Sequence, residues 1–544
     1  MDGLRPRRWG LNLVAVLVLA AAAGPAAANE TVYDADGYKL VVGMHVGFGV
    51  FGADDVDFGV GDINSRVPVD GPFPAWQRRA TRTWFETYAK AFAEVETPFF
   101  GFGHTYGVVG VDGALTRGSG DALSSLASQG ARSTTSDAPQ DTELEDLVIG
   151  WHSGGLFTDS LGDDAVDLSA GRQSFVVGDA FLIGSGVVNG FGRAAFTLQP
   201  HTSFDHAAIL KVNSAPVRLQ LFNLETRTDQ NLMHGFDQPK AKVAGFDLAL
   251  FKSGAELSGQ KAAGEKEANQ AAQETAAARD KKETADTWTA GVNFLHIYDA
   301  DSTPGPFSFP AGEPSPTLSV NGNRNGLNVY SGYLQGAFVE SEPDILLYSQ
   351  FVLERNDAAN RRVSADAWYV EPGYRFSALP WTPQLNVRYA HFSGDPNPND
   401  RIKESYDPLF AASGDRGFGS WTMGEIFGAF IGPNSNLNVK MAHLKSTPLP
   451  DLLDIGAIYY SFDFDHPAQF NDPRITAHHA ADELDLYAKW TPTDWLGVTG
   501  VFGFAVPGAG LKQAAQAFVA DNGPAGRATG RTETLAELIL EIKY

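Results

Sequence analysis

Period-two alternation of apolar and polar side chains is the feature that most restricts how this chain can fold. Within residues 364–376, Trp368 and Val370 fall on one side of an extended chain, whereas Glu371 and Arg375 fall on the other. Successive side chains of a β-strand point to opposite faces, so the pattern predicts a strand with one apolar and one polar face. After the first residues, no apolar stretch approaches the roughly 18 residues that a spanning helix needs. The apolar face therefore belongs either to the core of a soluble sandwich or to the lipid-facing side of a membrane barrel.

The first residues predict export from the cytoplasm. Three arginines among the first eight residues precede an apolar run at 11–23, and alanines at 26–28 follow it. This arrangement is typical of a secretory signal peptide, here residues 1–28, whose removal leaves a mature chain of residues 29–544.

Composition narrows the class further. The chain contains 58 Gly, 36 Phe, 16 Tyr and 10 Trp but five Met, which favours strands and turns over helices. It contains no Cys, so neither disulfides nor thiolate metal sites hold it together. The formal net charge of −24 argues against nucleic acid as a partner, because phosphate binding requires basic patches.

The alternation recurs along the chain and predicts one all-β domain, a transmembrane antiparallel β-barrel of about 18 strands. About nineteen segments fit the pattern, including residues 421–431, but a single-chain bacterial barrel usually has an even number of strands. Residues 213–216, 340–344, 378–382 and 432–435 fit short periplasmic turns. The expected alternation of short turns and long loops then fails between residues 447 and 482. Either one segment is not a strand or one strand is missing from the count, and we expect 18.

The last segment and the connections fit the same architecture. Residues 532–544 form an amphipathic strand that ends on the aromatic Tyr544, as in bacterial outer-membrane barrels; in a soluble protein the same segment would be an edge strand. We expect long loops at 116–142, 394–420 and 507–531. Residues 254–286 form a charged insertion that is either a solvated helix or disordered, and it is a candidate docking arm for a periplasmic secretion partner.

Several motifs, taken in order, resemble the alginate-export family of bacterial outer-membrane β-barrel proteins. They are Leu144-Glu145-Asp146 with Gly150-Trp151, Gly171-Arg172-Gln173, Gly178-Asp179, Leu182-Ile183-Gly184, Asp366-Ala367-Trp368-Tyr369, Gly373-Tyr374-Arg375-Phe376, Pro380-Trp381 with Pro383, Ser393-Gly394-Asp395 and Tyr406-Asp407-Pro408-Leu409-Phe410. The resemblance implies an 18-stranded barrel in the outer membrane of a Gram-negative cell that lets a polysaccharide or related solute cross. It also implies a pore lined with Arg and Lys and gated by an outer and a periplasmic loop. Residues 116–142 lie where the outer loop would be.

The phase of the apolar faces predicts which charged side chains line the lumen. The expected pore-lining or solute-binding residues are Arg172, Arg218, Glu371, Arg375, Arg388, Lys440 and Lys489. Alternation leaves the direction of Arg172 ambiguous, and the resemblance favours inward. A guanidinium binds a uronate carboxylate bidentately, which suits a polyanion path. Alternatively, these cations pair with Glu371 and other inward acids and simply fill the lumen.

Chemistry other than transport has little support in the sequence. His466, His478, His479 and Asp482 are close in sequence, but we interpret them as an exposed loop and expect no metal, and the acidic run at 462–465 lacks the spacing of a Ca²⁺ loop. No nucleophile or cofactor motif is present, so we expect no enzyme and no cofactor. The expected function is an outer-membrane channel for an anionic or polyhydroxylated solute, an exported alginate-like polysaccharide by resemblance, with membrane lipid and lipopolysaccharide around it. A small-solute uptake porin is the alternative, and an outer-membrane hydrolase comes third.

Overall fold

The computed structural model describes residues 30–35, 37–59, 81–118, 140–186, 194–226, 241–252, 288–300, 324–339, 341–357, 362–412, 423–432, 434–522 and 530–543. The strands are β1 (Glu30–Ala35), β2 (Tyr38–Asp54), β3 (Arg82–Pro98), β4 (His104–Gly118), β5 (Gln140–His152), β6 (Val166–Gln173), β7 (Phe204–Ser214), β8 (Val217–Glu225), β9 (Ala241–Lys252), β10 (Trp288–Ala300), β11 (Asn328–Gly336), β12 (Ile345–Asn356), β13 (Arg362–Arg375), β14 (Gln384–Phe392), β15 (Ile402–Lys403), β16 (Leu437–Leu449), β17 (Leu453–Phe464), β18 (His479–Thr493), β19 (Leu496–Pro507) and β20 (Glu533–Lys543). The helical segments are η1 (Val56–Gly59), η3 (Gly154–Phe157), η5 (Gly424–Ile431), η6 (Pro467–Phe470) and α4 (Ala509–Asn522).

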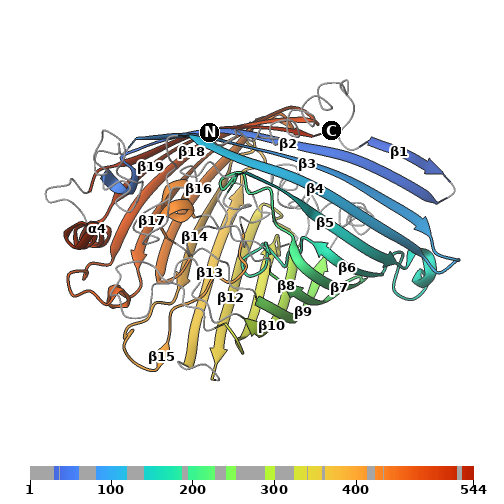
Figure 1. Cartoon of the computed structure of the whole chain (residues 1–544), viewed down its shortest axis with the longest axis horizontal. Helices are drawn as coiled ribbons and strands as arrows, with labels where there is room; N and C mark the ends of the chain where they lie inside the picture. The colour runs from blue at the N-terminus through green and yellow to red at the C-terminus, as the bar shows by residue number, and fades with distance from the viewer. Residues whose placement is uncertain are drawn as a thin grey trace, which may run out of the picture.

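Eighteen of these strands close into one antiparallel barrel. Neighbours in sequence pair from β2 through β14 and from β16 through β20, β14 pairs with β16, and β2 pairs with β20 to complete the ring. Figure 1 shows the tilted strands as one continuous wall that returns from the red strands to the blue ones. β1 only extends the edge of β2, and the two-residue β15 lies parallel to the start of β13. The predicted count of 18 is therefore confirmed.

The extra segment of the sequence count lies at residues 421–431, and its assignment as a strand is wrong. Its described part contains η5, a π-helix that lies inside the barrel. Ile426 and Phe427 are completely buried, and Phe427 stacks on Phe462 of β17 with 4.3 Å between ring centroids. A short apolar run does not distinguish a buried strand from a buried helix, because all its side chains are covered in either case. Residues 432–435 accordingly lead from η5 to β16 and are not a periplasmic turn between strands.

The two faces of the wall follow the predicted alternation. On β13, Val370 and Tyr374 are 43% and 41% exposed on the outer side, whereas Tyr369 and Glu371 on the inner side are 0% and 3% exposed. The outer face carries exposed Val, Leu, Phe and Tyr side chains on strand after strand, as a lipid-facing surface requires. Among the described residues, no helix has the length and apolar character needed to cross a membrane.

The two rims of the barrel differ in the length of their connections. At the rim where β2 begins and β20 ends, the connections at 215–216, 337–344, 376–383, 450–452 and 494–495 are short. The opposite rim carries the long connections, including 174–203 and 393–436. Outer-membrane barrels have short periplasmic turns and long outer loops, so we assign the short-turn rim to the periplasm. The expected insertion leaves from this rim, because β9 ends there and β10 begins there.

Two long connections fold back into the barrel, and we call their described parts the β6–β7 segment (174–186 and 194–203) and the β14–β16 segment (393–412, 423–432 and 434–436). Phe181 of the first segment packs on Tyr369 of β13, with 5.4 Å between ring centroids, and on Tyr406 of the second at 6.4 Å. An isolated bridge joins Ile183 to Phe410. These contacts bury an apolar cluster inside the barrel, and they bring together motifs that are more than 200 residues apart in sequence.

Several expected features lie partly or wholly outside the described residues. The signal peptide at 1–28 and the insertion at 254–286 are wholly outside them. Parts of the three long loops are outside as well, at 119–139, 413–420 and 523–529. Within the expected loop at 507–531, the structure forms helix α4.

Candidate solute pathway in the barrel lumen

Basic side chains form a band on the inner wall near the short-turn rim. Register places Arg375 opposite Gln384, and Gln384 in turn opposite Lys445 on β16. Lys489 on β18 and Lys543 on β20 continue the band on the inner faces of their strands. All four cations are partly exposed. We call Arg375, Lys445, Lys489 and Lys543 the basic band.

The basic band is accompanied by fewer acids. Asp454 lies directly opposite Lys489 in the β17–β18 pairing, and Glu541 is close enough to Lys489 and Lys543 to interact with their charges. Arg375 also lies 3.5 Å from Asp344 in the β11–β12 turn. The four cations of the basic band are therefore accompanied by three acids at this rim, Asp344, Asp454 and Glu541.

Three other predicted lumen residues, Arg388, Glu371 and Arg218, face inward but are occupied by neighbouring groups. Arg388 is 4% exposed, and its Nε lies 2.7 Å from Oε2 of Glu371 on the adjacent strand. The Asn386 amide donates to the other oxygen of the Glu371 carboxylate at 2.8 Å. Arg218 faces inward from β8, near Asp247, which accepts a hydrogen bond from the Tyr333 hydroxyl. The Arg388–Glu371 pair corresponds to the alternative in which lumen charges pair across strands.

Lys440 points the other way from the prediction. It lies on the outer face of β16 opposite Tyr389, with its side chain 58% exposed and its Nζ 2.9 Å from Asp463. The inner face of β16 is instead apolar near the long-loop rim, because Val439 and Met441 are buried there in the cluster around the lumen segments. On this part of β16 the apolar face is therefore the inner one. Because Lys440 and Lys445 lie on opposite faces of the strand, the phase that predicts an inward Lys440 also predicts an outward Lys445, although Lys445 belongs to the basic band.

Arg172 lies beside a β-bulge at the end of β6, and its direction follows from the pairing. Its register partner is Leu147, which is 51% exposed on the outer face, so Arg172 shares that face instead of the expected inner one. It forms an ion pair with Asp205 and donates to the carbonyl of Leu144 at 2.6 Å.

Buried carboxylates on the inner wall hold the lumen segments in place. Glu86 of β3 is fully buried and accepts the backbone N–H groups of Thr197 and Leu198 at 2.8 and 3.0 Å. The Trp84 indole N–H also donates to Glu86, at 3.1 Å. A carboxyl oxygen at this position satisfies backbone donors that a segment inside a barrel has no strand to pair with.

A β-bulge in the β4–β5 pairing supplies a second anchor. It allows consecutive residues Glu145 and Asp146 both to be fully buried on the inner side. Glu145 accepts the N–H groups of Thr202 and Ser203, both at 2.9 Å, and Asp146 accepts the Ser203 hydroxyl at 3.2 Å. The Leu-Glu-Asp motif is thus the attachment point of the β6–β7 segment.

His201 of the same segment completes this anchor. Its Nδ1 lies 2.6 Å from Asp112 and 3.5 Å from Glu145, and Lys90 lies 2.7 Å from Asp146. Burial alone would lower the pKa of His201, but the charge and hydrogen bonds of Asp112 and Glu145 outweigh burial and raise it to about 9. His201 is therefore a cation at neutral pH.

The β14–β16 segment has an equivalent anchor at the start of η5. Glu483 of β18 is 1% exposed and accepts the N–H groups of Ile426 and Phe427 at 2.7 and 2.8 Å. Gly424 has a φ of +89°, and a Cβ there would lie 2.7 Å from a Glu483 carboxylate oxygen. Only a residue without a side chain allows this close approach.

The histidines expected in an exposed loop are engaged by protein groups. His479 contacts Asp463 and Asp482, both at 3.1 Å, and His478 contacts the carbonyl of Phe464 at 2.8 Å. In the acidic run, Asp465 accepts the backbone N–H of Gly394 at 2.9 Å. These residues stabilise the long-loop rim.

Residues 350–519 match the model of a protein family described as alginate export. This range begins in β12, ends in α4 and includes the whole β14–β16 segment. The predicted resemblance to the alginate-export family is confirmed over this range. No curated protein matches the chain.

Several solved structures are similar to this chain at low sequence identity. OccAB4 of Acinetobacter baumannii is 10% identical with a TM-score of 0.49, covering 92% of this chain and 97% of that one. OccK7 (OpdD) and OccD3 (OpdP) of Pseudomonas aeruginosa are each 10% identical, with TM-scores of 0.46 and 0.45. OccK7 covers 94% of this chain and 99% of its own, and OccD3 covers 96% and 97%.

The closed barrel with its apolar outer face and the family match both indicate a location in the outer membrane and a role in transport. This chain is a channel of the bacterial outer membrane, through which a solute or polysaccharide passes.

Proposed function

We propose that this channel passes an anionic, polyhydroxylated solute, specifically an exported polysaccharide of alginate type, without covalent chemistry. The basic band carries this proposal. Arg375, Lys445, Lys489 and Lys543 are partly exposed on the inner wall at the periplasmic rim, where an exported polyanion would enter. The match of residues 350–519 to the alginate-export family supports the same substrate class.

The acidic composition of the chain does not oppose an anion path. Glu86, Glu145 and Glu483 are at most 1% exposed, and each binds backbone N–H groups of a lumen segment. A carboxylate already surrounded by donors presents little charge to a passing solute, whereas the lysines of the basic band reach the lumen. Transient binding to such cations suits conduction, because a solute must also be released.

A small-solute uptake porin is the second candidate, and one observation favours it. The lumen segments fill part of the barrel with buried aromatic side chains such as Phe181, Tyr406 and Phe427. A lumen narrowed in this way passes a single sugar unit or a short oligosaccharide more readily than a long polymer, unless the lumen segments move aside.

The experiment is the reversal potential of the refolded protein in a planar bilayer under a gradient of low-concentration salt, which limits screening. We expect anion preference and block by added polyuronate. Lys445→Gln and Lys489→Gln should each reduce both. Lys440→Gln is the matched control, because it removes the same charge from the outer face of the strand that carries Lys445.

Each other outcome has a definite meaning. Anion preference with block by uronate monomers but not by the polymer would select the uptake porin. Cation preference, or equal effects of Lys440→Gln and Lys445→Gln, would refute a polyanion path along the basic band.

Two finer partner assignments belong to the same proposal. The apolar outer face meets lipid, and the long-loop rim meets lipopolysaccharide. The insertion at 254–286 leaves the periplasmic rim, where it serves as a docking arm for a secretion partner; unchanged secretion after its deletion would remove that role.

A further inference from the structure

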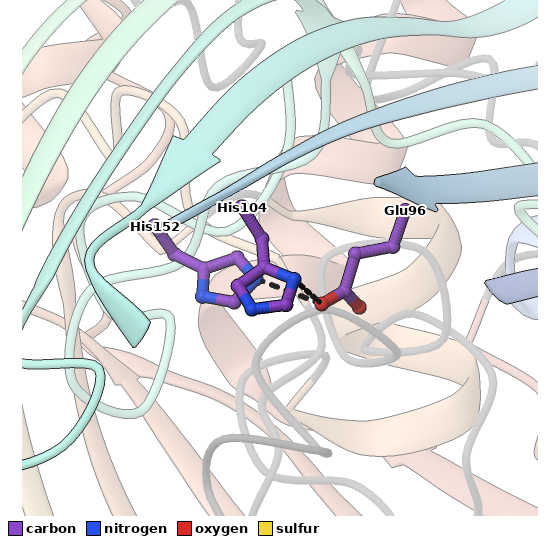
Figure 2. Close-up of side chains that lie close together, drawn as sticks. All are labelled: Glu96, His104 and His152. Carbon is purple, nitrogen blue, oxygen red and sulfur yellow. Dashed lines mark hydrogen bonds and ion pairs between the residues drawn. The ribbon is translucent and has the colours of Figure 1, made fainter. Parts of the chain in front are cut away.

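Three side chains converge on the inner wall at the periplasmic rim, outside the basic band. Glu96 lies near the end of β3, His104 begins β4 and His152 ends β5. Figure 2 shows the two imidazole rings one above the other, with both dashed lines meeting at one Glu96 oxygen. The ring planes are 7° apart, with 5.1 Å between centroids. One imidazole nitrogen from each histidine and one carboxylate oxygen all lie within 4.8 Å of one another.

Backbone geometry holds this group together. His104 and His152 are register partners on adjacent strands, so their side chains share a face. Gly103 has a φ of +78°, and a Cβ there would lie 2.2 Å from the carbonyl oxygen of His152. The β3–β4 turn approaches β5 this closely only because residue 103 has no side chain.

The hydrogen-bonding pattern leaves room for a cation at the centre. His152 Nδ1 lies 2.5 Å from Asp164, and its Nε2 lies 3.1 Å from Glu96. A neutral imidazole has one N–H, so one of these two nitrogens points a lone pair at a carboxylate unless a cation lies between them. The Nδ1 of His104 is buried and lies 3.2 Å from the same Glu96 oxygen without hydrogen-bond geometry. A second proton or a metal ion resolves this conflict.

The donor types and the two nitrogen–oxygen distances suit a metal ion. Because the imidazole planes are nearly parallel, the more exposed His104 ring must rotate to aim its nitrogen at the same ion. Zn²⁺ binds His nitrogen and carboxylate oxygen at about 2.0–2.2 Å, which makes the edge of its tetrahedron roughly 3.3 Å. The nitrogen–oxygen separations of 3.1 and 3.2 Å are close to this edge. Asp164 orients His152 from behind, as carboxylates commonly do for metal-bound histidines. Two imidazoles favour a transition metal over Ca²⁺ or Mg²⁺, which prefer oxygen ligands.

We propose that Glu96, His104 and His152 form a binding site for one divalent transition-metal ion, Zn²⁺ by ligand type, with water as the fourth ligand. His104 is the accessible ligand, with its side chain 32% exposed, whereas the side chains of His152 and Glu96 are 7% and 17% exposed. The ion joins β3, β4 and β5 at the mouth of the lumen and places positive charge beside the solute entrance.

The test uses the full-length, refolded protein without a polyhistidine tag, stripped of metal by a chelator. Calorimetric titration with Zn²⁺ should give one ion per chain. Co²⁺ should give the intense visible absorption of a four-coordinate site. His104→Ala and His152→Ala should abolish both signals, and Asp164→Asn should weaken binding by roughly 10–100-fold. Excess Ca²⁺ or Mg²⁺ should not displace the ion.

The matched control is His206→Ala, which alters another group of one histidine and two acids, Asp205, His206 and Glu225. Binding should survive this change. Loss of Zn²⁺ binding in His206→Ala but not in His104→Ala would overturn the assignment. Absence of stoichiometric Zn²⁺ binding by the unaltered protein would overturn it as well and would leave a protonated histidine pair. Because His104 is the most exposed ligand, its variant tests the site even where His152→Ala fails to fold.

Discussion

Glu483→Ala should release η5 from the inner wall. The Glu483 carboxylate accepts the N–H groups of Ile426 and Phe427 at 2.7 and 2.8 Å, and the side chain is 1% exposed. Alanine leaves two buried donors without an acceptor, and each unsatisfied donor costs about 1–3 kcal/mol. The local free energy of opening should therefore fall by about 2–6 kcal/mol. Since 1.4 kcal/mol is a factor of ten, the open population should rise at least about 30-fold.

Amide hydrogen exchange measures this change directly. Protection of the Ile426 and Phe427 amides should fall by at least about 30-fold, while amides in the β2–β20 pairing should keep theirs. In single-channel recordings the conductance should rise, because the β14–β16 segment narrows the lumen. Gly424→Ala should act in the same direction, since its methyl group would meet the Glu483 carboxylate.

Glu541→Ala is the control for charge alone. Glu541 is also an inward acid, but it lies near Lys489 and Lys543 at the periplasmic rim. It should alter ion preference without altering exchange at η5. Unchanged protection in Glu483→Ala, or equal loss in both variants, would refute the view that buried carboxylates anchor the lumen segments.

Three further predictions concern other buried groups. Arg388→Met leaves Glu371 buried without its cation and should lower the unfolding free energy by about 3–5 kcal/mol, read from the urea midpoint. The double variant with Glu371→Met should recover most of this loss. A loss below about 1 kcal/mol in the single variant would contradict a structural role for the pair. Because the folded pKa of His201, about 9, exceeds its ordinary value of 6.5, its contribution to stability is complete below pH 6.5 and is lost as pH rises through about 9. Urea midpoints from pH 6 to 10 should show this decline, and His201→Asn should flatten it; an unchanged slope in the variant would assign the decline to other groups. Tyr369→Phe removes the hydroxyl that donates to Asp179 at 2.6 Å and should cost about 1–3 kcal/mol in a thermal or urea melt, with Tyr374→Phe on the outer face as the neutral control.

Local pattern was sufficient to predict the wall of the barrel. Alternation on β13 predicts that Val370 faces lipid and Glu371 faces the lumen. The prediction works because a lipid-facing surface requires apolar side chains and a polar lumen requires polar ones. The even-number rule corrected the strand count although the segment at fault, residues 421–431, was not identified from the sequence.

What the pattern misses is the part of the lumen that is not polar. The phase of the apolar faces predicts that Lys440 points inward, yet the apolar side chains next to it, Val439 and Met441, are buried inside the barrel around the lumen segments. Hydrophobicity reports burial and not its direction, so a barrel that is filled by its own loops reverses the rule locally.

The group of Glu96, His104 and His152 was missed for a different reason. The two histidines lie 48 positions apart and meet only through the register of β4 and β5, which a single sequence does not provide. The glycine before His104 and the one two residues after His152 were the available signals, since both have positive φ and permit close approach.

The seam between β2 and β20 determines how this chain reaches its native state. It pairs residues from opposite ends of the polypeptide, such as His45 with Lys543. Contacts of such high sequence separation form slowly, because loop-closure entropy is lost before the contact stabilises anything. Until the seam forms, the sheet has two unpaired edges along β2 and β20, and such edges are templates for aggregation. Loss of the last strand would therefore give an open, aggregation-prone sheet and not a smaller barrel.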